Sequence, residues 1–408
     1  MITIYNITFF FLYNILRKKR PGNDVAKFLV LIYLICSLCG AIVYFGYSGA
    51  VQYPDRITIE SISVHIMLLA LFIWPFIKYS KNIDITYFKY NAHYMKVFSM
   101  LIAFPAIASL LLSIADVISI FAFGNFDVAR TAFAQGELDT GFVSRFGPLG
   151  YILALGPETC LLAVIMTFFW IFVIPNKKMA TIMFVSSLSL VVHNLSIAGR
   201  EGIIRWGLYF LLNIVLYKNF ISYEGHKLFW KLMCIGGGTL LFVFFLISND
   251  RFGYRDNGTL YTLFNYPGQP FYYFSYSYNR FADDSIYGLE YYFPMFFNVK
   301  FITMEMNSVI NADYHLNTFP TFVGSFLTKT GLINTLIYGI FWNALCLFLF
   351  GKKGRLTFYS TIAYFALFDV VLIGVLYYIH YTRFVHFAIF IYILIAAFLS
   401  KNFKYRKE

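Results

Sequence analysis

Charged residues are scarce in this sequence, and that scarcity excludes a soluble globular protein. Only 13% of the 408 residues are charged, whereas 60% are hydrophobic and the mean hydropathy is +0.67. A typical soluble domain carries charge on about a quarter of its residues. The composition therefore predicts a polytopic integral membrane protein whose main solvent is lipid.

The sequence also lacks the common signatures of metal, nucleotide and disulfide chemistry. It has no phosphate-binding loop, dinucleotide fingerprint, HExxH zinc site, Gly-x-Ser-x-Gly elbow or outward-facing Asp-x-Asp loop. Its five cysteines lie in apolar segments without metal-ligand spacing, so we interpret them as small core residues. We therefore expect neither a metal nor a cofactor.

Two further absences concern insertion and transport. The first apolar segment has no basic region before it and no small-residue cleavage site, which predicts a retained helix rather than a signal peptide. No strong internal repeat or inverted pair of broken apolar segments occurs, although many secondary transporters have them. The sequence therefore disfavours such a transporter.

What the sequence does contain is a series of apolar segments, each near the roughly 20 residues that cross a bilayer. Alternating strands of a membrane barrel are absent. We predict an all-α transmembrane helical bundle of about eleven helices, forming a single integral membrane domain over residues 1–408. The predicted helices cover residues 2–16, 27–47, 61–77, 97–122, 149–174, 179–198, 202–217, 228–248, 322–350, 357–378 and 384–400.

Basic residues predict the orientation of this bundle. Alternate loops hold 21 of the 32 lysines and arginines, which marks their face as cytoplasmic. Eleven helices then place the N-terminus outside and the C-terminus inside.

Arginine and lysine are distributed unequally between the two faces. The cytoplasmic loops hold seventeen lysines and four arginines, whereas the outer loops hold nine arginines and two lysines. A guanidinium group donates two parallel hydrogen bonds to one phosphate and is more weakly hydrated than an ammonium group. An outward-facing ligand with phosphate groups therefore explains the preference for arginine in the outer loops. The alternative is that the outer arginines pair with the carboxylates of the outer loops.

The outer loop over residues 249–321 is too long for a simple connection. It contains eighteen Phe or Tyr among the 46 residues from Phe252 to Phe297, nearly double the chain average. Such aromatic residues suit either sugar rings or the membrane interface. We expect Pro267-Gly268-Gln269-Pro270 to break any helix there, and Tyr287 to Met306 to form a surface helix.

The stretch from Asn194 to Trp206 places charge between two apolar segments. Gly199 and Gly202 predict a tight outer turn, after which a helix begins with its N-terminus outward. Free backbone N–H groups there, with Arg200 and Arg205, would form an anion site. The alternative for Arg205 is an ion pair with Glu201, four residues earlier on the helix.

A second group precedes the last helix, where His380 is a candidate general base and Arg383 a candidate phosphate ligand. His193, His315 and His386 are weaker candidates. The intramembrane acids Asp116, Glu158 and Asp369 could instead form a proton or ion path.

With these features the chain resembles the bacterial O-antigen polymerases, the Wzy-type oligosaccharide repeat unit polymerases. The resemblance covers nearly the whole chain and is carried by the turn Ala198-Gly199-Arg200-Glu201-Gly202, the long outer loop opening with Asn249-Asp250-Arg251-Phe252, and the abundance of Phe and Tyr. It implies a GT-C-like fold with short helices in the periplasmic loop 249–321 between helices eight and nine.

The resemblance also implies an activity, which is transfer of a growing glycan from undecaprenyl diphosphate to a lipid-linked repeat unit at the periplasmic face of the inner membrane. Arginines would stabilise the diphosphate leaving group without a metal, and a base would take the proton of the attacking sugar hydroxyl. The alternatives are an O-antigen ligase, which passes the glycan to lipid A-core, and a flippase for lipid-linked oligosaccharides.

Expected partners are undecaprenyl diphosphate-linked oligosaccharides, membrane lipid and a chain-length regulator protein, and nucleic acid is not expected. The predicted catalytic residues are His380, Arg200 and Arg205, and the predicted diphosphate-binding residues are Arg200, Arg205, Arg251, Arg255, Arg280, Arg383 and Arg130.

Overall fold

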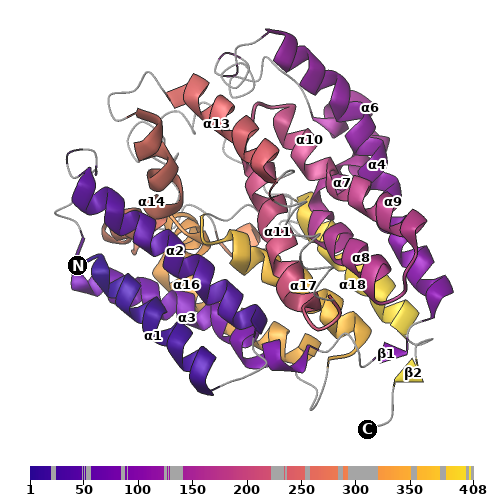
Figure 1. Cartoon of the computed structure of the whole chain (residues 1–408). Coiled ribbons are helices and arrows are strands. Elements are labelled where there is room, and N and C mark those ends of the chain that lie inside the picture. The colour runs from indigo at the N-terminus through magenta and orange to yellow at the C-terminus, as the bar shows by residue number, and fades with distance from the viewer. Residues whose placement is uncertain are drawn as a thin grey trace. The chain divides into compact units, whose positions relative to one another are not determined.

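The protein is described here from a computed structural model of the full-length chain (Figure 1). The residues it describes are 1–19, 24–47, 49, 51, 57–83, 88–89, 91–123, 126, 128, 141–221, 234, 237–252, 258–283, 288–292, 320–350, 356–376, 383–400 and 404–405.

Helices make up nearly all of the described chain. They are α1 (Thr3–Lys19), α2 (Asp24–Gly46), α3 (Ile59–Tyr79), α4 (Ala92–Phe123), α6 (Phe142–Phe146), α7 (Pro148–Glu158), α8 (Cys160–Phe172), α9 (Lys177–Ser187), α10 (Ser189–Leu195), α11 (Glu201–Tyr217), α13 (Gly238–Phe252), α14 (Gly258–Phe281), α16 (Phe322–Phe350), α17 (Phe358–Ile373) and α18 (Arg383–Ser400), with the 3-10 helices η3 (Ser80–Asn82) and η6 (Leu289–Tyr292). The strands within the described residues are two-residue segments, β1 (Phe88–Lys89) and β2 (Lys404–Tyr405), which pair antiparallel.

The prediction of an all-helical membrane protein is confirmed. Five segments in the described residues are long and apolar enough to cross a membrane, namely Asp24–Gly46, Ile59–Asn82, Ala92–Ala122, Lys177–Leu195 and Phe322–Phe350. The pair α7 and α8 makes a sixth candidate, although it is bent by 57° within the segment that the sequence predicts as one helix, residues 149–174. Every predicted segment overlaps a helix or a helix pair.

Residue contacts divide the chain into two compact units. Unit 1 comprises Met1–Asp84, Leu260–Leu356 and Ala366–Ile389, and unit 2 comprises Ile85–Thr259, Thr357–Phe365 and Phe390–Glu408. Each unit has a buried core of its own.

In unit 2, α8 is buried from Cys160 to Trp170 and packs against α9 and α11. Trp170 of α8 donates its indole N–H to Ser99 of α4 at 2.8 Å, which satisfies a polar group that lipid could not. Helix α7 lies close against α4 because Gly156 has no side chain, and a Cβ there would approach the Cα of Ala106 to 2.9 Å. The buried polar pairs and the glycine together fix these helices in position.

In unit 1, α14 crosses the residues that the sequence predicts as a helix break. The helix continues through Pro267 and Pro270, so the prediction was wrong. Gly268 explains the difference, because it packs directly on Gly40 of α2, and a Cβ on Gly40 would lie 2.9 Å from the carbonyl oxygen of Gly268. Packing of the two helices overrides the cost of proline in a helix.

The aromatic residues between positions 271 and 276 of α14 are buried rather than displayed to solvent or lipid headgroups. Phe271, Tyr272, Tyr273, Phe274 and Tyr276 are each at most 8% exposed. This part of the predicted aromatic loop is therefore core, and neither a sugar-binding surface nor an interfacial belt describes it. Most of the predicted surface helix from Tyr287 to Met306 lies outside the described residues.

Helix α16 is interrupted at Gly331, about one third of the way from its N-terminal end. Gly331 has φ 75° and ψ 171°, values outside the helical region that glycine tolerates without a steric penalty. The hydroxyl groups of Thr330 and Thr335 flank the break, and Tyr292 of η6 hydrogen-bonds to Thr330. These hydroxyls supply local polar partners where the break interrupts the backbone hydrogen bonds of the helix.

Candidate functional site

The turn between α10 and α11 is as tight as the sequence predicts. The α10 helix ends at Leu195, Arg200 is the N-cap of α11, and the N–H of Gly199 donates to the carbonyl of Asn194 at 2.8 Å. Ala198 has a φ of 50°, the only positive φ among the described residues other than glycine. Such a backbone costs an L-residue about 1–2 kcal/mol, so the surrounding turn must impose it.

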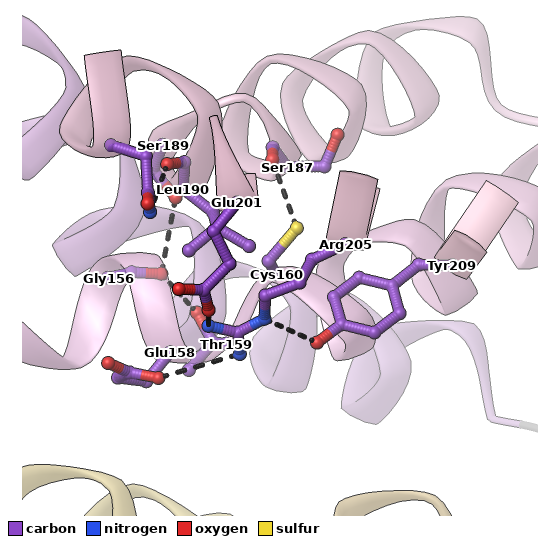
Figure 2. A network of polar contacts seen from close by, with 11 residues as sticks. Gly156, Glu158, Thr159, Cys160, Ser187, Ser189, Leu190, Glu201, Arg205 and Tyr209 are labelled. Carbon is purple, nitrogen blue, oxygen red and sulfur yellow. Dashed lines mark hydrogen bonds and ion pairs between the residues drawn. The ribbon is translucent and has the colours of Figure 1, made fainter. Parts of the chain in front are cut away.

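Arg205 projects from the first turns of α11 into a polar network within unit 2 (Figure 2). Its guanidinium lies 3.3 Å from the carboxylate of Glu201 and 3.9 Å from that of Glu158, and its Nε donates to the hydroxyl of Tyr209 at 3.1 Å. The side chain of Arg205 is only 6% exposed, whereas those of both glutamates are about one-fifth to one-quarter exposed. The ion pair allowed by the spacing of Glu201 and Arg205 is therefore present, and Glu158 adds a second carboxylate.

Hydrogen bonds between neighbouring helices hold this network in place (Figure 2). Ser189 of α10 donates to the carbonyl of Gly156 on α7 at 3.2 Å, and the thiol of Cys160 on α8 donates to the carbonyl of Ser187 at 3.2 Å. Trp206 of α11 donates its indole N–H to the hydroxyl of Ser187 at 3.0 Å. The backbone segments that carry Glu158 and Arg205 are thus held in place by contacts among α7, α8, α10 and α11.

Arg200 is also buried, but it points to a different helix. Its guanidinium donates to the hydroxyl of Ser248 on α13 at 2.5 Å and lies 5.2 Å from the ring centroid of Phe244. Its exposed fraction is 8%. The contact brings the Ala198–Gly202 turn against the end of α13, where the predicted outer loop begins.

The contact between Arg200 and Ser248 also brings the turn before α11 close to Arg251. Arg251 belongs to the last turn of α13, three residues after Ser248, and its backbone is therefore about one helical turn from the hydroxyl that Arg200 binds. Its side chain lies outside the described residues. Two arginine-bearing segments that are about fifty residues apart in the sequence thus meet in unit 2.

The remaining predicted ligands are distributed elsewhere. Arg280 is exposed in the last turn of α14, and Arg383 is the first residue of α18, with its side chain outside the described residues. Both belong to unit 1, whereas Arg200, Arg205 and Arg251 belong to unit 2. The predictions for Arg130, Arg255 and His380 fall on residues outside the described part.

A further ion pair involves an acid that the sequence marks as costly in a membrane. Asp116 of α4 lies 2.6 Å from the guanidinium of Arg145 on α6. Both intramembrane acids near this end of unit 2, Asp116 and Glu158, therefore have an arginine partner. Pairing offsets the cost of an isolated carboxylate and favours a structural or ligand-binding role over an ion path.

Unit 1 holds a histidine network that the sequence does not reveal. His65 of α3 is fully buried, its Nδ1 lies 2.8 Å from the hydroxyl of Tyr5, and its Nε2 lies 2.8 Å from that of Thr321. The ring of Phe274 stacks on it at 3.9 Å. Both ring nitrogens are satisfied, so His65 joins α1, α3 and α14 as a structural residue. A histidine inside an apolar segment was the only sequence signal.

The described residues contain no group of three or more His, Cys, Asp or Glu able to hold a metal ion. The polar groups present are guanidinium, carboxylate, hydroxyl and imidazole. Arginines at a helix N-terminus suit an anionic ligand such as a phosphate ester or diphosphate.

Comparison with known proteins adds no relative: no protein-family model, curated protein or solved structure matches this chain. The protein is thus an all-helical membrane protein with two buried arginines at the start of α11.

Proposed function

We propose that this protein is a glycan polymerase that transfers a growing glycan from undecaprenyl diphosphate to a lipid-linked oligosaccharide repeat unit. The observation that carries the proposal is the contact of Arg200 with Ser248, which joins the turn before α11 to the end of α13. A buried guanidinium at a helix N-terminus attracts a diphosphate strongly, because both the side chain and the helix end are positive. The excess of arginine over lysine in the outer loops supports the same ligand.

The proposed reaction needs charge stabilisation more than covalent chemistry. A sugar hydroxyl of the acceptor attacks the anomeric carbon of the donor glycan, the bond from that carbon to the diphosphate oxygen breaks, and the negative charge on the diphosphate grows. Arg200 stabilises that charge in a site held in place before the substrate binds. A general base removes the hydroxyl proton, and His380 is the base proposed from the sequence.

Arg205 takes part only if it exchanges a carboxylate for phosphate. Its contact to Glu158 is the longer of the two, at 3.9 Å against 3.3 Å for Glu201, so we propose that the diphosphate displaces Glu158 first. The remaining pair with Glu201 keeps Arg205 oriented along α11.

The proposed setting is a GT-C-like bundle of eleven membrane-crossing helices in the bacterial inner membrane. Its N-terminus and its active site face the periplasm, its C-terminus faces the cytoplasm, and a chain-length regulator is a proposed partner. The asymmetry of lysine and arginine between alternate loops supports this orientation. The burial of the α14 aromatics removes residues 271–276 from the surface that would cover the glycan.

Deletion of the gene tests the proposal against its alternatives. A polymerase mutant makes lipopolysaccharide capped with a single repeat unit. Loss of a ligase instead leaves full-length chains on the lipid carrier, and loss of a flippase traps single repeat units facing the cytoplasm. Either of the last two phenotypes contradicts the proposal.

A further inference from the structure

His193 is a second polar feature near the same end of unit 2. It lies on α10, two residues before the helix ends, and the ring of Phe142 from α6 stacks on its imidazole with centroids 5.1 Å apart and planes 24° apart. Its Nδ1 is buried and has no hydrogen-bond partner among the described residues. His65 provides the contrast, because both of its nitrogens are bonded.

A buried nitrogen without a hydrogen-bond partner lowers the stability of the folded protein. Leaving such a group without a partner costs about 1–3 kcal/mol, and native proteins keep few of them. A neutral imidazole with its proton on Nε2 presents a basic lone pair at Nδ1, so the missing partner is a hydrogen-bond donor. An O–H group, from water or from a ligand, fits this requirement.

The charged groups around His193 are already paired with each other. Asp116 of α4 acts electrostatically on the imidazole, and its carboxylate lies 2.6 Å from the guanidinium of Arg145. Burial disfavours a positive charge on the ring, which keeps the resting imidazole neutral and able to accept a proton, and the Asp116 carboxylate partly offsets that effect. Asp116 would then act as a positioning residue that stabilises the imidazolium.

The helix α7 connects His193 with the Arg205 network. Ser189, one turn before His193 on α10, donates to the carbonyl of Gly156 on α7, and Glu158 follows two residues later. Positions four apart on a helix share a face, so the face of α10 that carries His193 is the face that contacts α7. Helix α7 thus contacts the helix that carries His193, and it also carries Glu158, a partner of Arg205.

We propose that His193 is a catalytic residue. Its Nδ1 accepts a hydrogen bond from the hydroxyl of the acceptor sugar and takes the proton of that hydroxyl as the glycosidic bond forms. This inference rests on the proposed polymerase function, and it assigns to His193 the role of general base that the sequence suggests for His380. The sugar oxygen gains the bond to the anomeric carbon, its proton moves to Nδ1, and the electron pair of the broken bond leaves with the diphosphate. A later proton transfer to solvent restores the neutral ring.

The test uses the full-length protein in membranes with diphosphate-linked repeat units as donor and acceptor. His193→Gln keeps a polar side chain of similar length but cannot take a proton at neutral pH. We expect its kcat to fall about 100-fold or more, in line with general base catalysis, while the KM for the lipid substrate changes less than about 2-fold. His93→Gln is the matched control, because His93 is exposed at the start of α4.

A second variant separates catalysis from folding. His193→Ala removes the ring, and added imidazole should restore part of the lost rate if the ring carries a proton, whereas a purely structural histidine gives no rescue. Wild-type protein that makes no polymer overturns the proposed function itself. Wild-type activity in His193→Gln, loss of rate in His380→Gln alone, or a water on Nδ1 that persists with acceptor bound overturns only the role of His193.

Discussion

At the scale of single residues, the positive φ of Ala198 gives a prediction about the turn itself. Ala198 and Ala163 are both fully buried, but Ala163 lies inside α8 with helical backbone. Ala198→Gly and Ala163→Gly remove the same methyl group. Glycine costs about 1 kcal/mol in a helix and relieves about 1–2 kcal/mol of strain at a left-handed position.

We therefore expect Ala198→Gly to be more stable than Ala163→Gly by about 2–3 kcal/mol, the sum of those two backbone effects. Thermal unfolding of both variants in detergent measures the difference. Equal destabilisation would mean that the turn does not hold Ala198 in the left-handed region.

Arg205 and its carboxylates provide a second prediction at this scale. Arg205→Met leaves Glu158 and Glu201 together without their cation, whereas Glu201→Gln leaves Arg205 its contact with Glu158. Removing one partner of a buried pair costs about 3 kcal/mol or more. The glutamates are partly exposed, which reduces that cost.

We expect Arg205→Met to lose about 2 kcal/mol of unfolding free energy, a buried-pair cost lowered by solvent, and Glu201→Gln less than half of it. Unfolding in denaturant compares the two variants. A larger loss in Glu201→Gln would show that Glu158 contributes nothing to holding Arg205.

The residues of the candidate site were predictable to different degrees. Arg200 and Arg205 stand out in sequence because charge interrupts apolar segments. Glu201 follows from the helical spacing, but the distant partners do not, since Ser248 lies 48 residues from Arg200 and Glu158 lies 47 residues from Arg205. The partners of His65 are separated from it by 60 and 256 residues, so only the fold identifies them.

At the scale of secondary structure elements, the packing of α2 on α14 gives a third prediction. A methyl group on Gly40 would lie 2.9 Å from the carbonyl oxygen of Gly268, and Gly46, at the exposed end of the same helix, has nothing within 4 Å of its Cβ position. Overpacking of this kind costs about 1–3 kcal/mol.

We expect Gly40→Ala to destabilise the protein by about 2 kcal/mol through that overpacking, and Gly46→Ala to be neutral or slightly stabilising. Thermal unfolding of the two variants, which share one helix and one chemical change, provides the measurement. If the two variants have the same stability, α2 and α14 do not pack through these glycines.

Helix positions followed well from hydrophobic segments, because each predicted segment overlaps a helix or a helix pair. Helix α14 was missed for a physical reason. Local preference places Pro267 and Pro270 in a turn, and only the close approach of α2 at Gly268 reveals that a helix is stabilised there. The bend between α7 and α8 and the break at Gly331 depend on tertiary packing in the same way.

At the scale of the whole molecule, the proposed orientation predicts which residues are accessible from each side. Ser144 of α6 and Lys177 of α9 are both exposed, and they lie on opposite faces in the proposed topology. Each is replaced by cysteine in a background where Cys39 and Cys234, the described cysteines that are not buried, are changed to serine.

We expect an impermeant maleimide to label Ser144→Cys from the periplasm, and to label Lys177→Cys only after the inner membrane is opened. Labelling is followed by gel shift in cells with a permeabilised outer membrane. The reverse pattern would place the start of α11 on the cytoplasmic face and would contradict the proposed site.

The central claim is that Arg200 binds the diphosphate of a lipid-linked glycan, and chain length tests it most directly. Arg200→Lys keeps the charge but loses the planar fork. In a strain that lacks the chromosomal gene, its glycan ladder is compared with that of Arg17→Lys, the same change at an exposed residue of α1. With equal amounts of both variants in the membrane, we expect short or single-repeat products from Arg200→Lys and normal polymer from Arg17→Lys. Normal polymer from both would contradict the claim.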